Sequence, residues 1–208
     1  GIEYAVMQVI AESYDLLKKL GRLSNKKLAE IFAGLNKENR SFLLEITAKI
    51  LNHKNLIDLI KDSAEQKGTG KWTSEAAFEL GVSVPCIHAA VDARIISGAI
   101  KNRQAGKIFP KSINKIRAPK NFTEMIKDTV ELSTTCCYFQ GFDLLQTAKE
   151  KNNWNLDLSE IARIWRGGCI IRSKLLEKLL EALNKNAKKG KIAKLKLIKN
   201  FNGKANDE

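Results

Sequence analysis

Apolar residues recur every three or four positions along nearly the whole chain, and this spacing limits the possible fold more than any other feature. Such a period gathers apolar side chains on one face of an α-helix, whereas a half-buried strand would require alternation. No segment has a convincing strand pattern, so the sequence predicts an all-α fold. We expect helices over about 2–20, 25–35, 42–51, 73–80, 85–95, 123–149, 157–165 and 170–180, with a further helical stretch at 56–60.

Residues that favour helix ends stand between these segments. Ser24 and Ser41 precede the second and third segments, and a serine hydroxyl accepts a hydrogen bond from an unpaired N–H group of the first turn. Gly21 follows the first segment as glycine often follows a helix, and Pro85 suits the first turn of another. These positions support the predicted order of helices.

The 208 residues carry a net charge of +13, and the excess is confined to two segments. Residues 101–121 hold seven cations, no acid and two prolines without a clear period, so we expect a cationic loop. Residues 185–208 hold eight lysines against two acids, and we expect a poorly ordered Lys-rich tail after a helical domain of residues 1–184. Nucleic-acid-binding domains usually show a basic face with interleaved aromatic residues. We therefore expect no specific nucleic-acid partner, and nonspecific binding by the tail stays an alternative.

Composition excludes several classes of protein. No run reaches the ~18 apolar residues that a membrane span needs, and no signal peptide opens the chain, so we expect no membrane partner. The four cysteines have no C-x-x-C spacing and there are only two histidines, so we expect no metal site. Free thiols favour a reducing, cytoplasmic location. Because Gly1 leads directly into a helical pattern, we expect a fragment or a processed chain.

The best candidate for a ligand site is Asp-Ser-Ala-Glu-Gln-Lys-Gly-Thr-Gly-Lys-Trp at 62–72, just before a helix expected to start at Thr73 or Ser74. Glycine allows a backbone to approach a ligand, lysine supplies a charge for a phosphate, and threonine adds a hydroxyl donor. An anion site and an ordinary Gly-rich turn both fit this segment. A Walker A loop does not fit, because it requires glycine in place of Glu65 and Ser or Thr in place of Trp72. A dinucleotide fingerprint would require glycine in place of Thr73.

Four motifs follow one another along the chain. They are Gly-Ile-Glu-Tyr at 1–4, the segment at 62–72, Ala-Val-Asp-Ala-Arg at 90–94, and Trp-Arg-Gly-Gly-Cys-Ile-Ile-Arg-Ser at 165–173. In this order they resemble the C-terminal helical domain of the 6-phosphogluconate dehydrogenase family. The second and fourth motifs are specific, and the resemblance covers about residues 1–184.

This resemblance implies an oxidative decarboxylation in the pentose phosphate pathway. NADP takes a hydride from C3 of 6-phosphogluconate, the 3-keto acid loses CO₂, and the enediol is protonated to ribulose 5-phosphate. By resemblance, Glu3 is the general acid that protonates C1, Tyr4 binds the substrate, and Lys67, Thr69 and Arg94 surround its phosphate. Protonation requires a carboxylic acid within hydrogen-bond reach, and a phosphate favours converging Lys and Arg donors. From the residues alone, Glu3 could instead favour the helix dipole, and Arg94 could form a surface ion pair.

Parts of the family pattern have no match among the 208 residues. The family's catalytic lysine and an asparagine lie just upstream of the motif at 1–4, and the NADP-binding domain precedes them. The family's tail, which completes the phosphate site of the partner subunit, has no match after residue 184. Glu65 stands where the signature has Gly or Ala, so like-charge repulsion should weaken phosphate binding unless its carboxylate faces solvent.

Two hypotheses follow from the resemblance and its gaps. The leading hypothesis is a part of 6-phosphogluconate dehydrogenase that forms a homodimer and is inactive without the missing regions. The alternative is a non-catalytic helical domain that binds sugar phosphates or polyanions through Lys67, Arg94 and the cationic loop.

Overall fold

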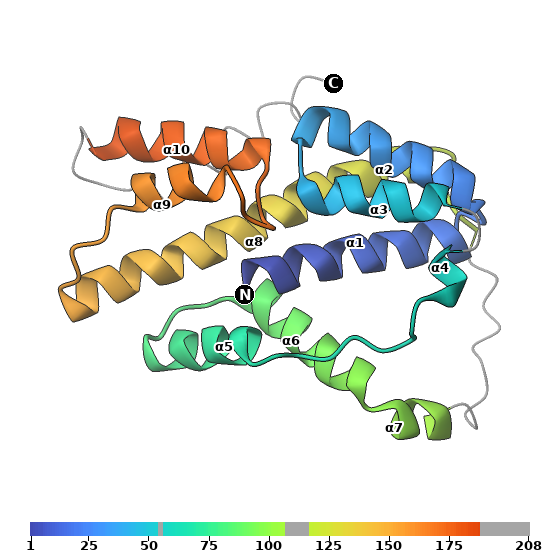
Figure 1. The fold of residues 1–208 in the computed structure, drawn as a ribbon, viewed down its shortest axis with the longest axis horizontal. Helices are drawn as coiled ribbons and strands as arrows, with labels where there is room; N and C mark the ends of the chain where they lie inside the picture. Colours follow the sequence, from blue (N-terminus) through green and yellow to red (C-terminus); the bar gives the residue numbers. More distant parts are fainter. Residues whose placement is uncertain (54–55, 107–116, 188–208) are drawn as a thin grey trace.

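The computed structural model describes residues 1–53, 56–106 and 117–187. Every regular element in these ranges is a helix, which confirms the predicted all-α fold (Figure 1). The helices are α1 (Ile2–Lys19), α2 (Asn25–Asn39), α3 (Phe42–Asn52), α4 (Leu56–Leu59), α5 (Thr69–Glu79), α6 (Pro85–Gly98), α7 (Ile100–Ala105), α8 (Phe122–Asn152), α9 (Leu158–Trp165) and α10 (Lys174–Ala187). None of them is both long and apolar enough to cross a membrane.

The predicted capping residues begin their helices. Ser24 accepts a hydrogen bond from the Lys27 N–H group at 3.3 Å, and Ser41 accepts one from the Leu44 N–H group at 3.5 Å. Each bond satisfies a donor that a helix leaves unpaired in its first turn. Pro85 stands in the first turn of α6, where its missing N–H group costs nothing.

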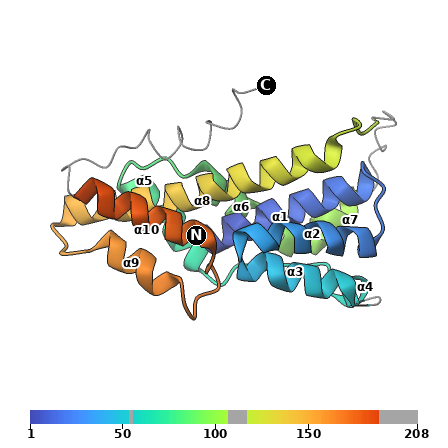
Figure 2. The same cartoon turned by 90° about the horizontal axis from the view of Figure 1, so that it is seen from above.

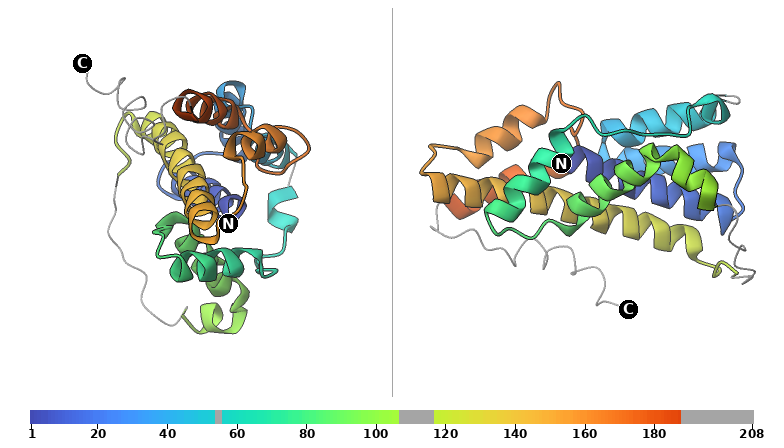
Figure 3. Two further views of the ribbon diagram at one scale, coloured as in Figure 1. Left: turned by 90° about the vertical axis from the view of Figure 1, so that its left-hand side faces the viewer. Right: turned by 90° about the horizontal axis from the view of Figure 1, so that it is seen from below.

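Helices α1 and α8 lie side by side through the middle of the molecule (Figures 1 and 2). The α2–α3 hairpin and the α9–α10 pair cover one side of them, while α5, α6 and α7 lie on the other (Figures 1 and 3). The 31 residues of α8 span the long axis of the molecule, so this helix reaches both the α9–α10 pair and the region of α1. The start of α1 lies beside α5 and α6.

The core is apolar and continuous across these layers. Its fully buried large side chains come from α1, α2, α6, α8 and α10 and from the turn before α6; they are Phe32, Leu17, Leu28, Ile87, Leu176, Val84, Val130 and Cys137. All four cysteines are free thiols. In the described residues, no three His, Cys, Asp or Glu side chains come together in a group that could hold a metal ion.

Several helix boundaries differ from the sequence prediction, among them those of α5, α7 and α10. Helix α5 begins at Thr69 rather than at Thr73, so Gly70 and Trp72 belong to its first turn. Helix α7 occupies 100–105 within the predicted cationic loop, of which residues 107–116 lie outside the described part of the chain. Helix α10 begins only at Lys174, because Ile171 is buried in a turn instead.

The predicted division at residue 184 stays a prediction. Helix α10 continues to Ala187, three residues into the segment assigned to the tail, and residues 188–208 lie outside the described part of the chain. The Lys-rich tail can therefore not be compared with its prediction.

The crossing of α1 and α8 depends on a glycine. A Cβ atom added at Gly141 of α8 would lie 2.4 Å from both Cγ1 and Cδ1 of Ile2, a residue that is itself buried. Such an overlap requires Ile2 or the helices to move. Gly34 of α2 offers a matched comparison, because a Cβ atom there meets nothing within 4 Å.

We predict opposite effects of alanine at these two glycines. Gly141→Ala should lower the free energy of unfolding by about 1–2 kcal/mol, since overpacking exceeds the gain in helix propensity. Gly34→Ala should raise it by up to ~1 kcal/mol through propensity alone. Urea unfolding followed by circular dichroism measures both values. A double-mutant cycle with Ile2→Ala should show coupling between positions 2 and 141, and additive effects would contradict the proposed contact.

Candidate functional site

Three of the recognised motifs meet at the start of α1. Residues 1–4 form its beginning, residues 62–68 run beside it as an irregular segment, and residues 90–94 belong to α6 (Figure 1). A Cβ atom at Gly1 would lie 2.5 Å from Cγ2 of Thr73, which shows how closely α5 approaches this end of α1. The chain thus gathers the predicted site residues from segments up to 90 positions apart.

Tyr4 is at the centre of this arrangement. Its side chain is buried, and its hydroxyl oxygen accepts a hydrogen bond from the backbone N–H group of Lys67 at 3.0 Å. The ring lies against Gly70, where an added Cβ atom would be 2.6 Å from Cδ2 of Tyr4. Gly70 is therefore required for a close approach between α5 and Tyr4. The hydroxyl hydrogen of Tyr4 is still available to donate to a ligand.

Arg94 packs over the other side of the site. Its guanidinium carbon lies 4.4 Å from the centroid of the Tyr4 ring, a cation–π contact. Nη1 donates to the Glu65 carbonyl oxygen at 3.1 Å, and Nη2 approaches Sδ of Met7 at 3.4 Å. Arg94 is thus not a plain surface ion pair, since it joins α6, α1 and the irregular segment.

The remaining candidate groups point to no partner. In the described part of the chain, no hydrogen bond or ion pair engages the Lys67 ammonium, the Thr69 hydroxyl or the Glu3 carboxylate. Lys67 and Thr69 are exposed, and Glu3 is half-buried in the first turn of α1. The Tyr4–Lys67 hydrogen bond and the Arg94–Tyr4 ring contact bring these three residues together, and Thr69 adjoins Gly70. Glu3 directly precedes Tyr4 at the same end of α1, and within the described residues its carboxylate forms no hydrogen bond or ion pair with the other candidates.

The beginning of α5 is suited to an anion. Gly68 precedes the helix with φ of 101°, a conformation that favours glycine, and no side chain caps the first turn. Free N–H groups at a helix start attract negative charge. Lys67 and Thr69 adjoin this turn in the sequence, and ammonium and hydroxyl groups are donors that suit a phosphate.

Glu65 does not oppose this chemistry from close range. Its side chain is 70% exposed and pairs with Lys61 at 3.7 Å, while only its backbone carbonyl faces Arg94. An exposed carboxylate paired in this way is screened by solvent.

The fourth motif lies apart from these residues and has a structural role. The Tyr138 hydroxyl donates to the Ile171 carbonyl oxygen, and the Ser173 hydroxyl donates to Tyr138 at 3.3 Å. Burial raises the pKa of Tyr138 to about 12, so this phenol stays protonated. Arg172 pairs with Glu45 at 3.8 Å and lies over the Phe42 ring. These contacts fix the turn between α9 and α10 against α8 and α3.

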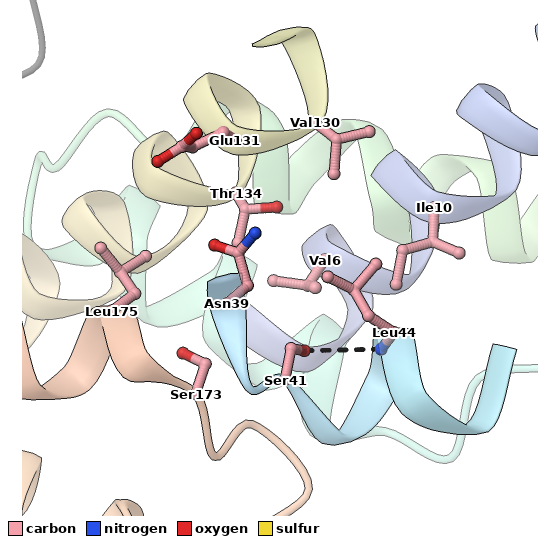
Figure 4. A pocket seen from close by; sticks show the side chains of 10 residues that line it. All are labelled: Val6, Ile10, Asn39, Ser41, Leu44, Val130, Glu131, Thr134, Ser173 and Leu175. Carbon is pink, nitrogen blue, oxygen red and sulfur yellow. Dashed lines mark hydrogen bonds between the residues drawn. The ribbon is translucent and has the colours of Figure 1, made fainter. Parts of the chain in front are cut away.

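A small pocket is lined in part by Ser173, the last residue of the fourth motif (Figure 4). Its lining is mixed, and comes from α1, α8 and the ends of α2, α3 and α10: Val6, Ile10, Asn39, Ser41, Leu44, Val130, Glu131, Thr134, Ser173 and Leu175. None of the five predicted site residues lines it. The candidate site therefore shares no residue with this pocket.

The strand–turn–helix unit that usually binds a dinucleotide such as NADP is not found in the described ranges, because no strand occurs in them.

Sequence reasoning missed residues that hold the site without carrying its chemistry. Met7 and Gly70 contact Arg94 and Tyr4, while Ser97 and Arg103 bind the irregular segment from α6 and α7. Gly70 had a signal, because a glycine inside a predicted phosphate segment indicates a close approach. The other three had none, since their role depends on how α6 and α7 fold against residues 62–65.

The comparisons with known proteins agree on one family. The family model for the C-terminal domain of 6-phosphogluconate dehydrogenase matches residues 1–208. The chain is 45% identical over 194 residues to a decarboxylating 6-phosphogluconate dehydrogenase of Synechococcus elongatus, covering 88% of this chain and 41% of that protein. It is 42% identical over 202 residues to a chloroplastic form from Spinacia oleracea, covering 89% and 38%.

A solved structure gives the same result. The 6-phosphogluconate dehydrogenase of Plasmodium falciparum, studied in its apo form and with NADP+ or 6-phosphogluconate, superposes with a TM-score of 0.85 at 37% identity. The match covers 98% of this chain and 49% of that one. The chain therefore spans less than half the length of the relatives that it matches.

We predict that Glu65→Ala leaves the affinity for inorganic phosphate within about twofold, because an exposed, paired carboxylate interacts weakly. Titration calorimetry with phosphate measures the change. Lys67→Ala is the positive comparison and should weaken binding by about tenfold, the loss of one charge-assisted contact. A tenfold tighter complex of Glu65→Ala would show that the carboxylate faces the anion.

Proposed function

This chain belongs to the 6-phosphogluconate dehydrogenase family, and on that premise we propose that it supplies the substrate-phosphate site and the proton donor of a decarboxylating dehydrogenase. The observation that supports the proposal is that Tyr4 binds the Lys67 N–H group and lies under Arg94, directly before α5 begins at Thr69. The family's reaction is the oxidative decarboxylation of 6-phosphogluconate to ribulose 5-phosphate and CO₂ with reduction of NADP.

The proposed roles follow from the free groups. The Lys67 ammonium, the Thr69 hydroxyl and the α5 N-terminus bind the phosphate of 6-phosphogluconate, and Arg94 faces the same region. The Tyr4 hydroxyl accepts from the Lys67 N–H group and donates to the substrate. Glu3 protonates C1 of the enediol, a step that needs an unengaged carboxylic acid.

The cofactor chemistry is assigned to regions outside these 208 residues. NADP accepts the hydride, and the family's base lysine precedes the motif at 1–4. We therefore propose that residues 1–208 bind 6-phosphogluconate but do not reduce NADP. A cytoplasmic location stays a prediction, because the relatives include chloroplastic forms.

The test compares ligands as well as variants. The chain of 208 residues should bind 6-phosphogluconate in competition with inorganic phosphate, and gluconate without its phosphate should not compete. Lys67→Ala should lower the affinity for 6-phosphogluconate by about tenfold. Lys49→Ala is a matched control, since Lys49 pairs with Glu45 on α3, away from the site. Wild-type chain that does not bind 6-phosphogluconate, or that reduces NADP alone, contradicts the proposal.

We also propose that the chain forms a homodimer, as its family does. Large apolar side chains are exposed on several elements, among them Ile95 and Ile96 of α6 at 52% and 60%, and Ile164 of α9 at 55%. Burial of such side chains against a second copy would stabilise a dimer.

The oligomeric state is directly measurable. At micromolar concentration, light scattering should give twice the mass of one chain, and dilution should eventually release monomer by mass action. A monomeric mass throughout this concentration range would contradict the dimer.

A further inference from the structure

The segment between α4 and α5 carries Lys67 but has no regular structure of its own. Four neighbouring residues of this segment are nevertheless bound by other elements. Asp62, Ala64, Glu65 and Lys67 each form a hydrogen bond to a side chain from α1, α6 or α7. The conformation of the segment is therefore set from outside.

Arg103 of α7 makes the first and most extensive of these attachments. Nη1 donates to the Asp62 carboxylate at 3.0 Å and Nη2 donates to the Asp62 carbonyl oxygen at 2.5 Å. Nε donates at 3.2 Å to the carbonyl oxygen of Ser97, near the end of α6. One planar guanidinium thus joins the segment to α6 and α7, a geometry that an ammonium group cannot reproduce.

Ser97 extends the attachment by two residues. Its hydroxyl oxygen accepts a hydrogen bond from the Ala64 N–H group at 2.9 Å. Arg94, one turn earlier on α6, then binds the Glu65 carbonyl, and Tyr4 accepts from the Lys67 N–H group. The four attachments thus follow one another along the segment from residue 62 to residue 67. The last of them, at Lys67, is part of the candidate site.

Arg103 itself does not belong to that site. Within the described residues, the hydrogen bonds of its side chain go to Asp62 and Ser97, and that side chain is only 30% exposed, whereas that of Asp62 is 96% exposed. The exposed charge pair adds little attraction, since solvent screens it. What the contact fixes is the position of the backbone carbonyls of Asp62 and Ser97, because the forked guanidinium of Arg103 binds both.

We propose that Arg103 is a positioning residue that holds residues 62–67 in the conformation that presents Lys67 to the substrate phosphate. This inference rests on the proposed phosphate site. Without Arg103, the segment samples other conformations, and the affinity falls by the fraction of time in which the binding conformation exists. The residue acts through Asp62 and Ser97 and makes no contact with the ligand.

Arg103→Gln, Arg103→Lys and Arg163→Gln form the test set, made in the chain of 208 residues. Arg163→Gln is a matched control, because it removes the same charge and an ion pair with Glu160 on α9. Amide hydrogen exchange of peptides covering 61–68 reports the attachment, and titration with 6-phosphogluconate reports its consequence. Asp62→Ala provides a further variant at an exposed position, where a failure to fold is not expected.

Arg103→Gln should speed amide exchange at 61–68 and lower the affinity for 6-phosphogluconate about fivefold to tenfold. This loss corresponds to a binding conformation that is occupied about 10–20% of the time. Arg103→Lys should behave like Arg103→Gln, since it keeps the charge but loses the fork. Asp62→Ala should show a smaller change in the same direction. Arg163→Gln should leave exchange at 61–68 and affinity unchanged.

The outcomes separate this inference from the proposed function. If wild type binds 6-phosphogluconate and Arg103→Gln binds it equally well, the positioning role is wrong while the phosphate site stands. Wild-type affinity in Arg103→Lys would show that charge rather than geometry matters and would also overturn it. Unchanged exchange at 61–68 in Arg103→Gln overturns the attachment whether or not wild type binds, whereas failure of wild type to bind refutes the phosphate site.

Discussion

The hydrogen bond from the Lys67 N–H group to the Tyr4 hydroxyl is the contact on which the candidate site depends. It ties the beginning of α1 to an irregular segment more than sixty residues away. Tyr4 is buried between Gly70 and Arg94, so its position is determined by the packing of α5 and α6 as well as by α1. A buried hydroxyl that lost this partner would leave a polar group unsatisfied, which is costly. Through this bond, the position of Lys67 depends on the packing of α1, α5 and α6.

Some residues of the site hold it together through their own contacts, and others keep polar groups without a hydrogen-bond partner in the described part of the chain. In the described residues, Arg94 has its guanidinium engaged and Tyr4 accepts one hydrogen bond, while the Tyr4 hydroxyl hydrogen and the polar groups of Lys67, Thr69 and Glu3 stay available. The positions of the free groups are set by backbone contacts rather than by their own side chains. This arrangement explains how exposed groups can be held in place, since ordering the backbone removes most of the freedom that binding would otherwise have to restrict.

The sequence predicted the helices well, because a period of three to four residues and Ser24 and Ser41 caps are local signals. It placed the start of α5 four residues late, since glycine has a low helix propensity and the packing of Gly70 on Tyr4 is a tertiary contact. It extended α10 to Ile170 because Ile171 is apolar, although that residue is buried in a turn held by Tyr138. The site residues came from family resemblance, and their local chemistry alone left Glu3 and Arg94 undecided. Arg103 and Ser97 could not be found from sequence, because only the folded chain brings them to residues 62–64.

The contact between Arg94 and residue 65 also accounts for the departure from the family signature at that position. Arg94 binds the backbone carbonyl of Glu65, and any amino acid supplies that oxygen. The side chain of Glu65 lies outward and pairs with Lys61, so neither the attachment nor the Tyr4 contact requires a small residue there. The glycine positions of the same segment differ in kind. Gly68 adopts a positive φ and Gly70 lies against a ring, so both are constrained by geometry that a Cβ atom would disturb. Within one motif, the structure thus separates positions where the backbone alone is used from positions where the absence of a side chain is required.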